Sequence, residues 1–125
     1  MSRLLVDTHA LLWWLSDDSA LSGRARDALA DPANELLVST ACLCEIAIMR
    51  ELGRLSVPDD LPAQAEAGGF GWLPVTAAHA WQVRALPRHH RDPFDRVLAA
   101  QSLIERLAII SADPQLRSYA VDIVW

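Results

Sequence analysis

The sequence predicts an α/β fold, namely a three-layer α/β/α sandwich with a central parallel sheet of four or five strands. Short apolar runs that do not alternate with polar residues are separated by segments with helical spacing, in the order β-α-β-α-β-α-β. Strands of this kind are typical of a parallel sheet covered by helices on both faces. The chain has 125 residues, 52% of them hydrophobic, and no repeat or linker divides it. We therefore predict a single domain spanning residues 1–125.

The first half of the chain contains two expected strands and three expected helices. Polar capping residues precede the helices, and Pro or Gly residues follow two of them. In chain order we expect a strand over Arg3 to Val6, a helix over Thr8 to Leu15, a helix from Ser22 to about Ala30, a strand over Glu35 to Val38, and a helix over Thr40 to about Leu52 that Ser39 caps and Gly53 ends.

The second half continues the same alternation. We expect a helix from Pro58-Asp59 to Ala67, a strand over Trp72 to Val75, a helix over Ala77 to Ala85, an exposed basic loop over Pro87 to Arg91, a helix from Asp92-Pro93 to about Arg106, a strand over Leu107 to Ser111, and an edge strand over Val121 to Trp125.

Composition excludes several kinds of chemistry. All eleven basic residues are arginine, so a P-loop and Schiff-base catalysis, which need lysine, are ruled out. The net charge of -5 means that a polyanion must be met by a local basic patch or a bound cation. Cys42 and Cys44 lie two apart in an expected helix and cannot form a disulfide with each other. Free thiols, and the lack of a long apolar run, predict a cytoplasmic protein without a membrane span.

Two acids are expected at one edge of the sheet. Asp7 directly follows the first strand, and Asp113 follows the strand over Leu107 to Ser111 by two residues. Ligands of such sheets bind at the carboxyl ends of the strands. Each acid could equally be a capping residue, but both occupy the same edge.

Glu45 is placed unusually on its expected helix. Thr40, Arg50 and Glu51 mark the solvent side of that helix, and Glu45 falls across from them among apolar neighbours. A buried glutamate is rare unless it is paired or binds something. We therefore interpret Glu45 as a functional residue.

Asp92 and Asp95 form a helix-start pattern, Asp-Pro-Phe-Asp. Asp92 suits the N-cap and Asp95 the first turn, where the helix dipole favours an anion. On this helix Asp95 shares a polar stripe with Ser102 and Arg106, so we expect it to be less buried than Glu45.

Four carboxylates, Asp7, Glu45, Asp95 and Asp113, would repel one another if they met. Two carboxylates about 5 Å apart repel by roughly 3 kcal/mol at an effective dielectric constant near 20. Such a cluster needs protons or a divalent cation, and an all-oxygen site suits Mg²⁺, with Mn²⁺ as a substitute. The pattern therefore indicates metal-assisted phosphodiester chemistry.

Four blocks of sequence resemble the PIN-domain family, and within it the VapC-type toxin ribonucleases of toxin–antitoxin systems. The resemblance covers essentially the whole chain. The matching blocks are Leu5-Val6-Asp7-Thr8-His9 with Leu11-Leu12-Trp13, Glu45-Ile46-Ala47-Ile48 with Leu52-Gly53-Arg54-Leu55, Leu86 to Arg96 with Ala99-Ala100-Gln101, and Ile110-Ser111-Ala112-Asp113.

This resemblance implies a Mg²⁺-dependent endoribonuclease that acts as a toxin. It also implies a homodimer, a VapB-type antitoxin that blocks the site, and a higher assembly with that antitoxin. The family's four acids lie on Asp7, Glu45, Asp95 and Asp113, which would be catalytic and hold the metal. Thr8 and Ser111 stand where the family often has a hydroxyl beside a metal-binding acid, and Asp92 is expected to assist from the side.

The mechanism we hypothesise is hydrolysis of an RNA phosphodiester by a metal-activated water. Basic residues concentrate in one stretch, and we expect them to contact the RNA backbone. They are Arg84, Arg88, His90, Arg91 and Arg96, with His89 beside them.

Two other functions stay open at this point. The pair His89-His90 with Asp92 is compatible with a transition-metal phosphohydrolase, although His9 and His79 show no obvious ligand spacing. A non-catalytic binding module is also compatible, because five tryptophans are many for a small core. Trp14, Trp81 and Trp125 are the candidates for a dimer or antitoxin surface.

Overall fold

The central sheet has five strands, all parallel, in the order β3-β2-β1-β4-β5. A computed structural model describes residues 2–88 and 92–125 of the chain. The strands are β1 (Arg3–Val6), β2 (Glu35–Ser39), β3 (Phe70–Leu73), β4 (Ala108–Ile110) and β5 (Ile123–Val124). The parallel sheet of the sequence prediction is therefore confirmed, with five strands.

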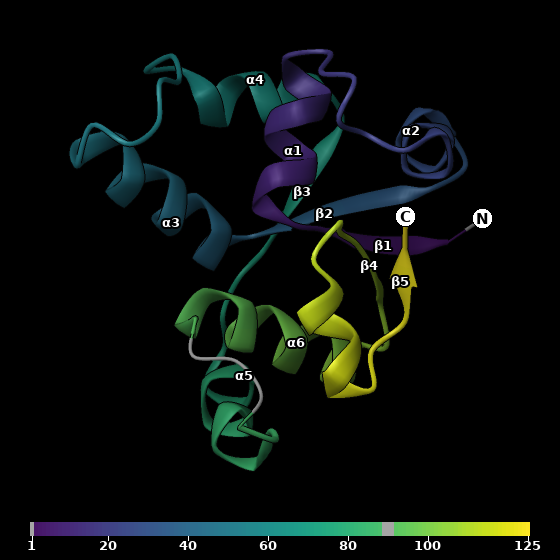
Figure 1. Cartoon of the computed structure of the whole chain (residues 1–125), viewed down its shortest axis with the longest axis vertical. Coiled ribbons are helices and arrows are strands. Elements are labelled where there is room, and N and C mark those ends of the chain that lie inside the picture. The colour runs from purple at the N-terminus through teal and green to yellow at the C-terminus, as the bar shows by residue number, and fades with distance from the viewer. Residues whose placement is uncertain (1, 89–91) are drawn as a thin grey trace.

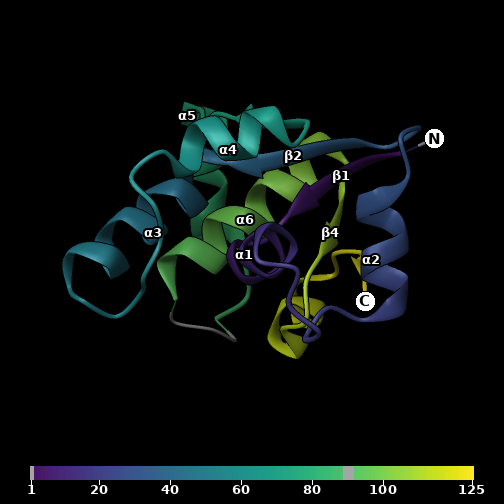
Figure 2. The same cartoon turned by 90° about the horizontal axis from the view of Figure 1, so that it is seen from above.

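Helices cover both faces of the sheet (Figures 1 and 2). Figure 1 shows α1, α2 and α4 on one side of the strands and α5 and α6 on the other. This is the expected three-layer α/β/α arrangement. The helices within the described residues are α1 (Thr8–Leu15), α2 (Gly23–Ala30), α3 (Thr40–Glu51), α4 (Leu61–Ala67), α5 (Ala77–Gln82) and α6 (Pro93–Glu105), with 3₁₀ helices η1 (Val83–Ala85) and η2 (Pro114–Tyr119).

Local sequence explains where most helices begin. The side chains of Asp7, Ser22, Ser39, Thr76 and Asp92 each accept a hydrogen bond from a backbone N–H in the first turn of the helix that follows. A cap of this kind stabilises a helix by about 1 kcal/mol. The caps expected at Ser39 and Asp92 are therefore confirmed.

Three elements differ from the prediction, and in two of them a proline lies at the changed boundary. Strand β3 is formed by residues 70–73 and not by 72–75, since Pro74 has no N–H to extend a sheet ladder. The helix expected from Pro58-Asp59 begins only at Leu61, and Pro62 occupies its first turn. The predicted helix over residues 77–85 is divided, with α5 ending at Gln82 and η1 following it.

The strand order creates a crevice between β1 and β4. Strands β2 and β3 are added on one side of β1, whereas β4 and β5 are added on the other. The backbone N–H of Asp7 donates to the carbonyl of Ile110 at 3.1 Å, so the β1–β4 pairing continues up to the first acid. In open α/β sheets, ligands bind at this kind of switch point, outside the carboxyl ends of the strands.

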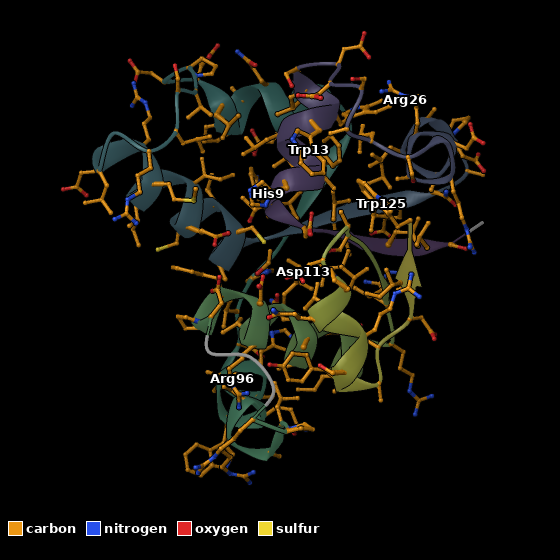
Figure 3. The ribbon with its side chains drawn as sticks, viewed as in Figure 1. His9, Trp13, Arg26, Arg96, Asp113 and Trp125 are labelled. Atoms are coloured by element: carbon orange, nitrogen blue, oxygen red, sulfur yellow. The ribbon has the colours of Figure 1, made fainter. Side chains whose placement is uncertain are left out.

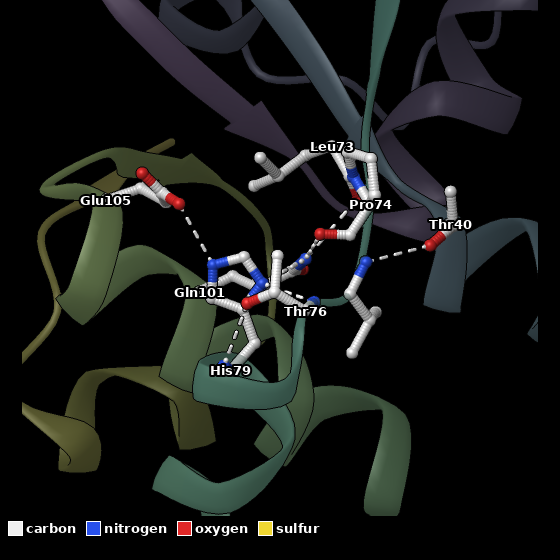
Figure 4. A network of polar contacts seen from close by, with 8 residues as sticks. Thr40, Leu73, Pro74, Thr76, His79, Gln101 and Glu105 are labelled. Carbon is white, nitrogen blue, oxygen red and sulfur yellow. Dashed lines mark hydrogen bonds and ion pairs between the residues drawn. The ribbon is translucent and has the colours of Figure 1, made fainter.

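A buried polar network ties α5 to α6 and to the segment after β3 (Figure 4). The backbone N–H of Thr76 donates to His79 Nδ1 at 3.0 Å, and His79 Nε2 lies 3.0 Å from Glu105 Oε1. Because Nδ1 is the acceptor, the proton of the neutral ring lies on Nε2 and is donated to Glu105. Gln101 Nε2 donates to the carbonyls of Leu73 and Pro74 at 3.4 and 3.3 Å. This network fixes α6, which carries Asp95 in its first turn and is capped by Asp92.

Within the described residues, none of the helices has the length and apolar character that a membrane crossing requires. Cys42 and Cys44 are both free thiols, as expected from their spacing, with Cys42 buried and Cys44 exposed.

Candidate functional site

The four predicted acids, Asp7, Glu45, Asp95 and Asp113, line one cleft. Its volume is about 280 Å³, and its other lining residues are Thr8, His9, Asp92 and Gln115. The acids come from the end of β1, from α3, from the first turn of α6 and from the segment after β4. The topology of the sheet therefore assembles carboxylates that are far apart in the sequence.

Asp7 is the most buried of these acids, with 8% of its surface exposed. Its Oδ1 accepts a hydrogen bond from the Ala10 N–H at 2.8 Å, which caps α1. Burial raises the pKa of Asp7, and the charge of Asp113 adds to the rise. Hydrogen bonds from Ser111 and Ala10, and the proximity of His9, oppose it. The site thus holds a carboxylate whose ionisation is costly until a cation compensates it.

Asp113 lies beside Asp7 because β4 is paired with β1. Its Oδ1 accepts from the Gln115 N–H at 2.9 Å and so caps η2. The Asp113 N–H in turn donates to Ser111 Oγ at 3.0 Å. The buried Ser111 hydroxyl therefore connects the two edge acids, since it also hydrogen-bonds the Asp7 side chain.

Glu45 reaches the cleft, but not by facing the core as its helical position predicted. The residues of α3 that are buried are Cys42 and Ile46, whereas Cys44 and Ile48, the expected apolar neighbours of Glu45, are exposed. Glu45 is half-buried, and Thr8 Oγ1 donates to its Oε1 at 2.6 Å. The expectation of burial was wrong because the core side of α3 is formed by Cys42 and Ile46, whereas Glu45 lies beside it and contacts Thr8 of α1.

Asp92 caps α6, as its position predicted. Its Oδ1 accepts from the Phe94 N–H at 2.9 Å and from the Asp95 N–H at 3.5 Å. Asp95 is half-buried in the first turn. The polar stripe expected for it is incomplete, because Ser102 is buried and its hydroxyl donates to the carbonyl of Leu107. Asp92 and Asp95 both line the cleft.

The buried thiol of Cys42 lies close enough to the acids of the cleft for their charges to affect its pKa. Burial raises the pKa of Cys42 to about 12, and the negative charges of Asp7, Glu45 and Asp95 contribute. A hydrogen bond with Thr8 opposes this rise. Cys42 therefore stays a neutral thiol that packs behind the acids and is not a nucleophile.

The donor chemistry of the cleft fits a hard divalent cation that retains water. Its acidic lining supplies only oxygen donors, which Mg²⁺ and Mn²⁺ prefer. Within residues 2–88 and 92–125, no group of three or more His, Cys, Asp or Glu side chains is placed so that it could hold a metal ion by direct contacts alone. An open acidic cleft of this kind suits Mg²⁺, which commonly makes one or two direct carboxylate contacts and keeps several waters.

Three of the predicted RNA-binding residues, Arg84, Arg88 and Arg96, lie in the described part of the chain. Arg84 and Arg88 are exposed, and the Arg84 guanidinium lies 4.7 Å from the ring centroid of Trp81. The Arg96 guanidinium is half-buried and donates to the carbonyls of Pro87 and Val83 at 2.8 and 3.0 Å. These bonds give Arg96 a structural role at the base of the loop. His90 and Arg91, with His89, lie outside the described residues.

Two lining residues of the cleft were not among the predicted site residues. His9 is exposed on the second residue of α1, and Gln115 follows Asp113. The sequence feature that could have identified them is their position, because His9 lies two residues after Asp7 and Gln115 lies two residues after Asp113. His79, by contrast, is buried against Glu105 and does not line the cleft, which disfavours a histidine-based metal site. A larger groove of about 680 Å³ between α3 and α4 is mainly apolar and lacks this acid cluster.

The profile of the PIN domain matches residues 4–122. The chain belongs to the PIN-domain family. Its sequence is 30% identical over 122 residues to "Ribonuclease VapC22" of Mycobacterium tuberculosis, covering 95% of this chain and 93% of that protein. The resemblance found in the sequence is thereby confirmed.

Solved structures share the PIN fold at low sequence identity. The VapBC2 structure from Rickettsia felis, bound to a promoter DNA fragment, matches with a TM-score of 0.72 at 8% identity, covering 97% of this chain and 96% of that one. A toxin–antitoxin complex from Klebsiella pneumoniae matches with a TM-score of 0.57 at 18% identity, covering 88% and 86% of the two chains. At these identities the likeness establishes the fold of this PIN protein and no more.

Proposed function

We propose that this PIN protein is a Mg²⁺-dependent endoribonuclease and the toxin of a VapBC-like toxin–antitoxin pair. The observation that carries the proposal is the cleft at the β1–β4 switch point, where acids from four separate segments meet. Clustered carboxylates are destabilising unless a cation is bound, so a function is the reason to retain them. The relative named Ribonuclease VapC22 supports ribonuclease activity as the chemistry.

Each residue has a separate task in this proposal. Asp7, Asp95 and Asp113 would hold the ion, directly or through water. When bound, Mg²⁺ supplies a water of lowered pKa and neutralises charge on the phosphate. Glu45, oriented by the 2.6 Å hydrogen bond from Thr8, would position the attacking water and accept its proton. Ser111 fixes the Asp7 carboxylate between strands β1 and β4.

The direct test is cleavage of RNA by the purified chain with Mg²⁺, Mn²⁺, Zn²⁺ or chelator present. We expect activity with Mg²⁺ and Mn²⁺, and a loss of at least about 100-fold in Asp7→Asn and Asp95→Asn. Asp31→Asn is the matched control, because Asp31 is an exposed turn aspartate whose Oδ1 accepts from the Ala33 N–H at 2.9 Å. Cleavage that persists in Asp7→Asn contradicts the proposal. A chain that binds a partner and never cuts RNA would instead be a binding module.

We further propose a VapB-type antitoxin, a homodimer with a higher assembly around that antitoxin, and a cytoplasmic location. The structural neighbours from Rickettsia felis and Klebsiella pneumoniae are toxin–antitoxin complexes, which supports the antitoxin. Trp81 on α5 is 68% exposed, and Leu103 and Ile104 on α6 are also exposed, so apolar surface is available for association. Trp14 and Trp125, also considered for an interface, are half-buried. Light scattering of the purified chain, alone and with the product of the adjacent gene, tests the assembly.

A further inference from the structure

His9 lies where two chemically different clefts meet. It lines the acid cleft with Asp7 and Asp113, and it also lines a mainly apolar groove of about 300 Å³. Leu12, Trp13, Leu55 and Val57 are among the groove's other lining residues. Among the described residues, His9 is the one that both linings share. Figure 3 shows its side chain between Trp13 and Asp113.

An aromatic series leads away from His9 across the surface. The His9 and Trp13 rings are 5.6 Å apart between centroids and tilted by 45°. The Trp13 and Trp125 rings are 5.8 Å apart and tilted by 52°. Trp13 and Trp125 pack against the core, whereas His9 is exposed. The series therefore ends in an exposed imidazole that is supported from behind.

Among the described residues, the imidazole of His9 has two neighbours that act on it, the Trp13 ring and the charge of Asp7. Within the described residues its ring makes no hydrogen bond, and its ring contact is with Trp13. Its surface is thus available to a flat partner. Aromatic and histidine rings stack on unpaired bases in proteins that bind single-stranded RNA.

A nucleotide has two parts that match the two clefts. The phosphate is anionic and would go to the cation of the acid cleft, whereas the base is flat and largely apolar on its faces. The groove beyond His9 is lined mainly by apolar side chains. A base entering the groove from a phosphate held at the acids would have to pass His9.

We propose that His9 stacks on a nucleobase of single-stranded RNA that flanks the phosphate held in the acid cleft. His9 is then a substrate-positioning residue, supported by Trp13. The inference rests on the proposed ribonuclease function and extends it to a base-contacting subsite. Since a stacked base is recognised by its faces, the contact favours unpaired RNA over a duplex, in which those faces are covered.

The test separates base stacking from a phosphate contact. His9→Ala, His9→Phe and His9→Lys are made in the Glu45→Gln background with Mg²⁺ present, so that the RNA is not cut while Asp7, Asp95 and Asp113 are kept. Two fluorescein-labelled probes are compared, namely a random-sequence RNA decamer and a decamer of the same ribose–phosphate chain without bases. Asp31→Asn, at an exposed turn that lines neither the acid cleft nor the groove, is the control.

We expect His9→Ala to weaken binding of the RNA decamer about tenfold and to leave binding of the base-free decamer unchanged. His9→Phe should bind the RNA within about twofold of the parent, because it keeps a ring against Trp13, and His9→Lys should resemble His9→Ala. With Glu45 restored, His9→Ala should raise KM about tenfold with little change in kcat.

Three results would overturn the inference in distinguishable ways. Equal losses on both probes, or rescue by His9→Lys, would make His9 a phosphate contact. If a folded His9→Ala variant binds RNA as well as its parent, and the unaltered chain cleaves RNA in a way that depends on Asp7, the stacking inference is refuted and the ribonuclease proposal stands. An unaltered chain that neither binds nor cuts RNA would remove the ribonuclease proposal, and the stacking with it.

Discussion

Replacing Asp7 with asparagine is expected to stabilise the metal-free protein while it removes the proposed activity. Asp7 is nearly buried, and its pKa is raised chiefly by that burial. At neutral pH the folded chain therefore bears the cost of a buried charge close to Asp113, which an uncharged side chain of the same shape would not carry. Functional sites often cost stability in this way.

The magnitude follows from which contacts the substitution keeps. Asparagine is as good an N-cap as aspartate, so the 2.8 Å hydrogen bond from the Ala10 N–H is retained. The hydrogen bond with Ser111 can also be kept, because the hydroxyl rotates. What is removed is the charge, and each unit by which the pKa is raised corresponds to about 1.4 kcal/mol at neutral pH. Single substitutions that stabilise a protein commonly add about 0.5 to 2 kcal/mol to the free energy of unfolding, and we expect the gain of Asp7→Asn to lie in that range. Asp7→Ala, which also loses the cap, should be about 1 kcal/mol less stable than Asp7→Asn.

The pH dependence of stability shows independently that Asp7→Asn should be the more stable chain at neutral pH. Because the folded-state pKa of Asp7 lies above its ordinary value of 3.8, this group's stabilising contribution is present below pH 3.8 and lost as the pH rises through the folded-state pKa. The advantage of Asp7→Asn should therefore vanish at low pH and reach its full size once Asp7 is ionised in the folded chain.

Urea unfolding with EDTA present, from about pH 3.5 to pH 8, measures this difference. Asp31→Asn is the control, since Asp31 is exposed and its substitution should change neither stability nor its pH dependence by more than about 0.5 kcal/mol. An Asp7→Asn variant that is less stable than the unaltered chain at pH 7, or whose advantage grows toward low pH, would refute the reasoning.

Three further predictions concern the cation, the buried network and the arginines. Mg²⁺ at ten times its Kd should stabilise the unaltered chain by about 1.4 kcal/mol in thermal unfolding and Asp7→Asn much less; equal shifts would place the ion elsewhere. His79→Ala should lower the free energy of unfolding by about 2 kcal/mol in urea titrations, because it removes the capping box of α5 and the bond to Glu105, whereas His9→Ala should cost less than half as much. Arg96→Ala should lower the free energy of unfolding by about 1 to 2 kcal/mol, since two carbonyls lose their donor. Arg88→Ala should leave stability unchanged and reduce the slope of log K against log salt concentration for RNA binding by about one unit. The reverse pattern would show that Arg96 is the residue that contacts RNA.

Much of the fold can be predicted from local sequence because caps and apolar runs act over a few residues. Ser22, Ser39 and Asp92 begin the helices that they were expected to begin, and the parallel sheet follows from apolar strands that do not alternate. The prediction is weaker where a neighbour decides the boundary. Strand β3 is displaced by two residues because it pairs with β2 and must stop before Pro74.

The sequence alone predicted which acids line the cleft and the edge on which Asp7 and Asp113 stand, since Asp7 directly follows a strand and Asp113 follows another within three residues. Three features were decided only by the tertiary structure. Strand β4 lies beside β1, and Glu45 is half-buried and accepts a hydrogen bond from Thr8 at the cleft. Arg96 donates hydrogen bonds to backbone carbonyls. The physical reason is that the interactions act over different distances along the sequence. A cap or a strand end depends on a few neighbouring residues, whereas the partner of Thr8 is 37 residues away, and which face of α3 is buried depends on helices that the sequence near Glu45 does not encode.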